Sequence, residues 1–203
     1  MLHRVVVVAW CAVLLAGCAA PTRAGTAPTA ASPAPPSMQA RWWEWAAAEP
    51  VETNPVADRT GEHCARNQPS DVWFLAGTFG GQAQRRCTVP LGMRIVAPAI
   101  NRVSGNADDC RTYMADAAGA IQLDGVQVSL ERIEHESITF VAGPGNPVTD
   151  TSGKTRGEAC GLWARIDPPS AGEHKVRIHG KSGTFELDVT YTLVVAAATK
   201  SAA

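Results

Sequence analysis

The chain has 203 residues, 45% of them hydrophobic and 18% charged, and its 18 Lys and Arg against 19 Asp and Glu give a formal net charge of −1. This length and composition suit one globular domain with appendages and exclude two full domains. The near-neutral balance and the absence of a dense Lys/Arg block argue against nucleic acid as a partner.

Residues 1–17 have the pattern of an export signal. Arg4 provides the positive start, and an apolar run of eleven residues from Val5 to Leu15 follows it. A run of this length is too short to span a bilayer, which needs about 20 apolar residues. We therefore predict a signal peptide over residues 1–17.

The signal ends in Leu15-Ala16-Gly17-Cys18, which resembles the bacterial lipobox. In that motif the cysteine thiol is acylated and the cysteine becomes the new N-terminus. The resemblance implies a lipoprotein whose partner is the membrane, anchored by lipid on Cys18 to the extracytoplasmic face of the bacterial cell membrane. An ordinary secretory signal ending near Ala20, or an uncleaved anchor, is the alternative.

Residues 18–40 after the signal consist almost wholly of Ala, Pro, Thr, Ser and Gly, with Arg23 as the one charged residue. Such a stretch has no apolar surface to bury, so we predict a disordered tether. We expect the folded domain over residues 41–196 and a flexible tail over 197–203.

A tryptophan cluster opens the expected domain. Trp42, Trp43 and Trp45 lie in a short helix-compatible run that Pro50 ends. One interpretation is a lid whose indoles close one end of the core. The other is an aromatic platform that stacks on sugar rings.

The remaining elements are mostly short strands separated by turn-forming residues. A hairpin is expected where strand 72–75 is followed by Gly80-Gly81 and strand 85–89, and another around Asp124-Gly125. A helix is expected from an N-cap at Asp108 to Gly119, and 143–157 reads as a long exposed loop. The other strands are expected at 93–97, 121–123, 126–130, 138–141, 161–166, 174–179 and 184–195. The chain should be mainly β, an antiparallel β-sandwich or jelly roll with one or two short helices.

Four cysteines remain once Cys11 has left with the signal and Cys18 carries lipid: Cys64, Cys87, Cys110 and Cys160. An even set in an oxidising compartment implies two disulfides, and four cysteines allow three pairings. We hypothesise one bridge within the first hairpin, from Cys64 to Cys87, and one from the helix to the final sheet, from Cys110 to Cys160. The spacing required for a zinc site is absent, so no metal is expected.

Candidate ligand-binding residues are Trp43 and four polar residues near the first strands, Asn54, Asp58, Gln68 and Arg86. Asn and Asp side chains in such positions also bond nearby backbone groups, so turn capping is the alternative role.

Catalytic chemistry has no familiar signature in the chain, so we expect no catalytic residues and no cofactor. His174 and His179 fall on opposite faces of one expected strand, which prevents a shared metal there. The acidic residues Asp58, Glu62 and Asp71 are the candidates for a carboxylate pair of the kind that glycoside chemistry needs.

Several motifs are spread over most of residues 41–196: Val72-Trp73-Phe74-Leu75-Ala76-Gly77, Arg86-Cys87-Thr88-Val89-Pro90-Leu91-Gly92, and Ala171-Gly172-Glu173-His174. Together they resemble a group of uncharacterised secreted bacterial proteins. The resemblance implies an architecture and a domain boundary, and it implies no mechanism. The chain departs from that group at Cys160-Gly161-Leu162-Trp163, where members have an Asp-Gly-Tyr-Trp stretch, so no ligand preference is carried over.

These observations favour a membrane-anchored lipoprotein with a non-catalytic binding domain. Its ligand would be an envelope glycan or another extracellular ligand, such as a protein. The alternatives are a polysaccharide-acting hydrolase or lyase and a structural or partner-binding envelope protein. The tether, the expected exposed loop over 143–157 and the tryptophans favour a binding domain.

Overall fold

The structure is a computed structural model that describes residues 34–149 and 151–196. The predicted signal peptide, Cys18, the 18–33 part of the predicted tether and the 197–203 tail lie outside the described residues. None of the described helices is long and apolar enough to cross a membrane.

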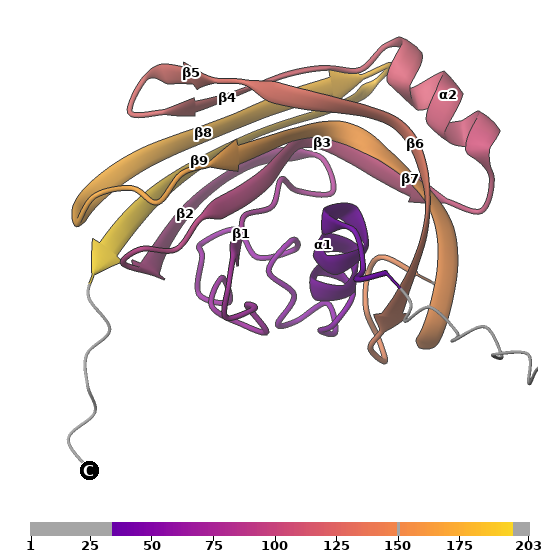
Figure 1. Cartoon of the computed structure of the whole chain (residues 1–203), viewed down its shortest axis with the longest axis horizontal. Helices are drawn as coiled ribbons and strands as arrows, with labels where there is room; N and C mark the ends of the chain where they lie inside the picture. Colours follow the sequence, from indigo (N-terminus) through magenta and orange to yellow (C-terminus); the bar gives the residue numbers. More distant parts are fainter. Residues whose placement is uncertain (1–33, 150, 197–203) are drawn as a thin grey trace, which may run out of the picture. The chain divides into compact units, whose positions relative to one another are not determined.

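Two helices and nine strands make up the described residues, and the strands form two sheets (Figure 1). In chain order the elements are α1 (Met38–Ala46), β1 (Trp73–Phe74), β2 (Gly81–Pro90), β3 (Ile95–Ser104), α2 (Ala107–Ala115), β4 (Ala118–Leu123), β5 (Val126–Val128), β6 (Leu130–Ala142), β7 (Gly153–Ile166), β8 (Gly172–Ser182) and β9 (Phe185–Ala196). The prediction of a mainly β chain with one or two short helices is confirmed.

The strand order is β1-β3-β7-β6 in the four-stranded sheet and β2-β9-β8-β4-β5 in the five-stranded sheet. Five of the seven strand pairs among the described residues are antiparallel, whereas β1–β3 and β2–β9 are parallel. The predicted sandwich is therefore confirmed, and two parallel pairs join its antiparallel strands.

The local hairpin expected between 72–75 and 85–89 does not form. β1 pairs with β3, and β2 runs parallel to β9 from Gly81 opposite Leu187. Alternate residues are buried along both β2 and β9, so one face of each strand is buried and the other is not. A strand's own alternation carries no information about a distant partner, which is why the sequence pattern favoured the nearer one.

The two sheets approach each other closely at one crossing. A Cβ at Gly180 would lie 2.1 Å from the Ala99 carbonyl oxygen, so only glycine fits there. Ala99 lies in an irregular part of β3, between Pro98 and Ile100, where the register with β7 shifts. This crossing fixes the course of β3 just before Asn101 and Arg102.

Helix α1 begins at Met38, three residues before the expected start of order at Arg41. The Ser37 side chain accepts a hydrogen bond from the Ala40 amide at 3.2 Å and caps the helix. Gln39 is buried and its amide nitrogen donates to Glu136 at 2.7 Å, which ties the helix to β6. The predicted tether was therefore too long at its C-terminal end, because its composition hid a helix cap.

The other local predictions were of mixed accuracy. The Asp124-Gly125 hairpin is confirmed, with φ of 51° and 83°, as a type I′ turn requires. Helix α2 is capped by Asn106 instead of Asp108, and it ends at Ala115, before Gly119. The expected loop over 143–157 is shorter, because β7 already begins at Gly153 and pairs there with β6.

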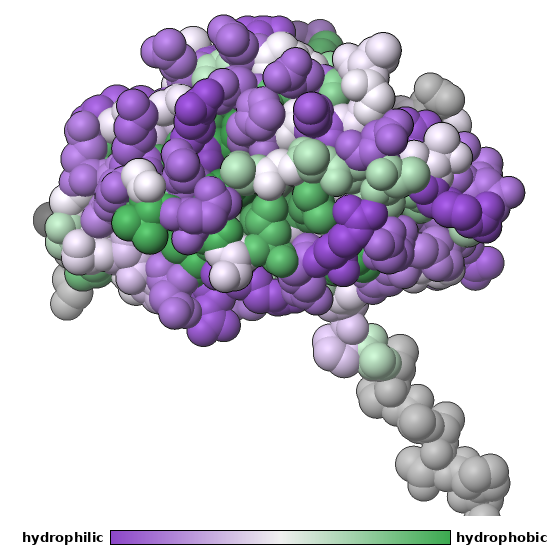
Figure 2. All heavy atoms as spheres, turned by 90° about the horizontal axis from the view of Figure 1, so that it is seen from above, coloured by the Kyte–Doolittle hydropathy of each residue, from purple (hydrophilic) through white to green (hydrophobic). Residues whose placement is uncertain are grey.

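Both predicted disulfides are present, Cys64–Cys87 and Cys110–Cys160. Cys64 lies in the coil before β1 and not on a strand, so its bridge fastens that coil to β2. The second bridge fastens α2 to β7. Polar side chains dominate the face seen in Figure 2, and a band of hydrophobic residues lies between them.

Candidate functional site

The side chains of Asn54 and Asp58, two of the predicted ligand-binding residues, bond backbone groups of the coil after α1 and of the last residue of α1. The Asn54 amide nitrogen donates to the carbonyl oxygens of Ala46 at 2.8 Å and Glu49 at 3.1 Å, and its oxygen accepts from the Val56 amide. The Asp58 carboxylate accepts from three backbone amides, and these bonds hold the pKa of Asp58 below its usual value against the opposing effect of burial. In the structure both residues cap turns.

Gln68 and Arg86 do not line the cavity described below. The Gln68 side chain donates to the Phe74 carbonyl oxygen and accepts from the Phe74 amide. Arg86 is exposed and forms an ion pair with Glu173 at 3.0 Å. The buried arginine is its neighbour Arg85, which donates to three backbone carbonyl oxygens and to the Tyr191 hydroxyl. Alternation along β2 turns residue 85 inward and residue 86 outward.

The indoles of the tryptophan cluster belong to the core. Trp42, Trp43 and Trp45 are 2%, 7% and 4% exposed, and Trp42 packs edge-on against Trp163 of β7. These exposed fractions match the interpretation of a lid over the core, although Trp42 and Trp43 also border a cavity. Trp43 alone among the five predicted ligand-binding residues also lines a cavity.

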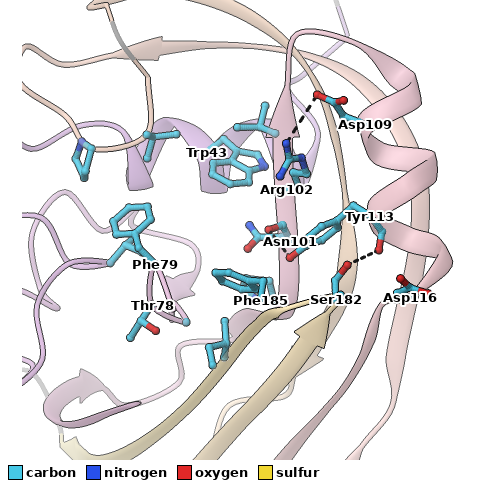
Figure 3. A pocket seen from close by; sticks show the side chains of 18 of the residues that line it. Trp43, Thr78, Phe79, Asn101, Arg102, Asp109, Tyr113, Asp116, Ser182 and Phe185 are labelled. Atoms are coloured by element: carbon cyan, nitrogen blue, oxygen red, sulfur yellow. Dashed lines mark hydrogen bonds and ion pairs between the residues drawn. The ribbon is translucent and has the colours of Figure 1, made fainter. Parts of the chain in front are cut away.

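That cavity, called the cleft below, has a volume of about 640 Å³ (Figure 3). Its walls come from α1, α2, β3, the loop between β1 and β2, the turn between β8 and β9, and Pro147-Val148. The volume lies within the range of roughly 300–1,000 Å³ common for small-molecule sites. Segments distant in sequence therefore meet around one hollow.

Two buried nitrogen atoms on the cleft wall have no hydrogen-bond partner, Trp43 Nε1 and Asn101 Nδ2. Among the described residues only one other buried side-chain nitrogen or oxygen is in this state, Trp73 Nε1, which is not on the cleft wall. A buried donor without a partner costs about 1–3 kcal/mol. Each such group in a native structure calls for an explanation, and two of the three among the described residues lie on the cleft wall.

Aromatic side chains surround the Asn101 amide. In Figure 3 it lies among the rings of Trp43, Tyr113 and Phe185, with Phe79 on the far side of the hollow. Phe79 is 52% exposed and is followed by two glycines with φ of 109° and 80°. The cleft therefore combines apolar ring faces with a few polar atoms, the usual make-up of a ligand site.

Charged groups of the cleft lie beside α2. Arg102 pairs with Asp109 at 3.8 Å, and its guanidinium lies 5.8 Å from the centre of the Tyr113 ring. Asp116 also lines the cleft, and within the described part of the chain it has no ion-pair partner. Burial raises the pKa of the Tyr113 phenol, so it stays protonated and donates to the Asn101 carbonyl oxygen at 3.2 Å.

Sequence reasoning missed Asn101, Tyr113, Phe79 and Phe185, which the cleft brings together. Each of these residues lies in or next to a predicted element. Their positions in the sequence follow no pattern that would place them at one site. The one local signal was Phe79, which lies in the glycine-rich segment 77–81. An aromatic side chain in such a segment is expected to be exposed, where it can contact a ligand.

The acidic candidates for glycoside chemistry, Asp58, Glu62 and Asp71, do not line the cleft. Asp71 forms an exposed ion pair with Arg41, and Asp58 caps a turn. Among residues 34–149 and 151–196, no group of three or more His, Cys, Asp or Glu side chains is placed to hold a metal ion.

No protein-family profile and no curated protein matches the chain. Among solved structures, it is similar to the cysteine protease inhibitor EhICP2 from Entamoeba histolytica (12% identity, 63% of this chain and 99% of that chain, TM-score 0.31). Amebosin is similar at 11% identity, over 56% of this chain and 97% of that chain, with a TM-score of 0.27. A family 123 glycoside hydrolase from Clostridium perfringens is similar at 10% identity, over 56% of this chain and 23% of that chain, with a TM-score of 0.25. At these scores the likenesses carry no argument about function.

Proposed function

We propose that the chain is a non-catalytic binding protein that holds an envelope glycan in the cleft while a lipid on Cys18 anchors it to the extracytoplasmic face of the bacterial cell membrane. The observation that carries the binding role is the pair of unpartnered donors, Trp43 Nε1 and Asn101 Nδ2, on the wall of one aromatic cavity. A ligand with acceptor oxygens would give both atoms the partners that they lack.

Anchoring is supported by the sequence of residues 15–18, which resembles the lipobox, and by the motifs shared with secreted bacterial proteins. Replacing Cys18 with Ser tests it by cell fractionation. We expect C18S to appear in the soluble fraction or as an unprocessed precursor, because the hydroxyl does not replace the thiol in acylation. A processed C18S protein that still sediments with membranes would contradict the proposal.

Binding in the cleft is tested by co-sedimentation of the purified protein with insoluble bacterial cell-wall polysaccharide. W43F and W73F each remove an unpartnered buried indole N–H, but only Trp43 lines the cleft. Wild type and W73F should sediment with the polysaccharide, and W43F should remain largely in solution. Failure of the wild type to sediment, or an equal loss in both variants, would overturn the proposed role.

A hydrolase is the second candidate, because Asp109 and Asp116 line the same cleft and glycoside hydrolysis uses two carboxyl groups. Asp109 is already paired with Arg102, which leaves Asp116 as the one available acid or base there. Release of reducing ends from cell-wall polysaccharide by the wild type but not by D116N would favour this function. Binding without any such release favours the non-catalytic one.

A further inference from the structure

We infer that the cleft selects an uncharged saccharide ring, and this rests on the binding role proposed above. The ring's oxygen atoms would accept hydrogen bonds at the inner wall, and its C–H face would pack on the phenylalanines at the rim. The inference narrows the ligand from glycans in general to those without carboxylate, sulfate or phosphate groups on the bound ring.

The inner wall carries two buried donors without partners. Trp43 is 93% buried, and both its indole N–H and the Asn101 amide nitrogen lack partners. Two of the lining hydroxyl groups are already in use, because Ser182 donates to the Tyr113 carbonyl oxygen at 2.7 Å and Thr78 donates to Gly81. A ligand must therefore bring acceptor oxygens, as the hydroxyl, ether and acetamido groups of a sugar do.

The outer wall is apolar and open. Phe79 is half-exposed, and a Cβ at the neighbouring Gly80 would lie 3.7 Å from the Phe185 ring, so the two phenylalanine segments are adjacent. Large exposed aromatic side chains beside a hollow mark contact surfaces. One face of a pyranose ring presents only C–H groups, which suit such a surface, while the ring edge keeps its oxygens for the donors.

Charge argues against an anionic ligand. The three charged lining residues, Arg102, Asp109 and Asp116, sum to +1 − 2 = −1. The single cation is held by Asp109 and by the Tyr113 ring, so an anion would have to compete with both. Beside the exposed Asp116 carboxylate it would also meet a like charge, which solvent screens in part.

A wholly apolar ligand, such as an acyl chain, also fits poorly. It would offer no acceptor atom to Trp43 Nε1 and Asn101 Nδ2, so both donors would stay buried without a partner and their cost would remain. An uncharged ligand with several oxygen atoms is the class that satisfies the donors, the rings and the charge together.

The test is calorimetric titration of the purified protein with three trisaccharides: N-acetylglucosamine trimer and glucose trimer, which are neutral, and galacturonate trimer, which is acidic. At least one neutral trimer should bind, and the acidic one should bind at least tenfold more weakly. N101L and W43F should each weaken the neutral trimer about tenfold, because a loss of 1.4 kcal/mol changes an affinity by that factor. W73F should leave its affinity unchanged.

The rim is tested by F79A, with L91A as its matched control. Phe79 and Leu91 are 52% and 49% exposed, but only Phe79 lines the cleft. F79A should weaken the neutral trimer several-fold with an unchanged melting temperature, and L91A should change neither. Equal effects of the two substitutions would overturn the packing of the sugar face on Phe79.

The outcomes separate the inference from the proposed function. If the acidic trimer binds best and N101L weakens it, the uncharged class is wrong and the cleft remains a binding site. If no neutral trimer binds, the inference is overturned, whereas co-sedimentation with cell-wall polysaccharide still decides the binding role. If a trimer binds equally to wild type, N101L and W43F, the cleft is not the site and the proposed function fails as well.

Discussion

Replacing Asn101 with Leu should stabilise the ligand-free domain. The side chain lies on β3 opposite Gly161, and its amide nitrogen is buried without a partner. Leucine has nearly the same shape as asparagine and carries no group that needs a hydrogen bond. Leucine at position 101 therefore removes the energetic penalty of a buried donor without a partner.

The magnitude follows from the cost of an unsatisfied buried donor, which is about 1–3 kcal/mol. The free energy of unfolding should rise by the same amount, about 1–3 kcal/mol. For a domain of this size, each kcal/mol raises the melting temperature by about 2–4 °C. The Tyr113 hydroxyl bonds the backbone carbonyl oxygen of residue 101, so that contact survives the substitution.

Thermal unfolding followed by near-ultraviolet circular dichroism measures the change, and N54L provides the matched control. Asn54 is fully buried with its amide bonded to Ala46 and Glu49 and its oxygen to Val56, so leucine there leaves three backbone groups unpaired. N54L should lose about 3 kcal/mol or more. An N101L protein that melts below the wild type, as N54L should, would refute the reasoning, because the Asn101 amide would then have a stabilising partner in the fold.

The other predictions concern a disulfide and pH. Removing the Cys110–Cys160 bridge with a double alanine substitution should cost about 4 kcal/mol by the chain-entropy relation for its sequence separation of 50, and an unchanged melting curve would show that the bridge does not stabilise the domain. The side-chain hydrogen bond with Asp124, at 2.7 Å, raises the pKa of His174 above its usual 6.5. Because the pKa of His174 is raised in the folded state, the stabilisation from the His174–Asp124 pair is complete below pH 6.5 and is lost as pH rises through the folded-state pKa. Because the pKa of Asp124 is lowered, the same stabilisation is present above about pH 3.8. The difference in melting temperature between wild type and H174Q should therefore be larger at pH 5.5 than at pH 8.5, and a difference that grew with pH would contradict the assignment.

Local features of the fold were predictable because they depend on neighbouring residues. Two left-handed positions at Asp124-Gly125 need only those two residues, so the hairpin was predicted correctly. Alternation of apolar and polar residues likewise identified the half-buried strands in the C-terminal half. The disulfide pairing was also predicted correctly, although the hairpin that motivated the Cys64–Cys87 bridge does not exist.

The candidate site was predictable only at Trp43. Asn54, Asp58 and Gln68 looked suitable because polar residues near turns suit ligands as well as backbone caps, and burial decides between the two roles. Asn101 drew no attention in the sequence, since an asparagine after a strand of apolar residues reads as a strand end. Its missing partner became visible only with every neighbouring donor and acceptor in place.

The sequence by itself determined the β-rich class, the even set of four cysteines, the short hairpin and the expectation of a lipid on Cys18, because each depends on residue type, spacing or short-range geometry. The choice among the three disulfide pairings stayed a hypothesis until the structure brought the partners together. Tertiary structure alone decided that β2 pairs with β9, that α1 and α2 border one cavity with the β1–β2 loop, and that two buried donors there lack partners. The physical reason is that a strand or a donor is complete only through its partner. When that partner lies about a hundred residues away, as β9 does from β2, the local sequence does not identify it.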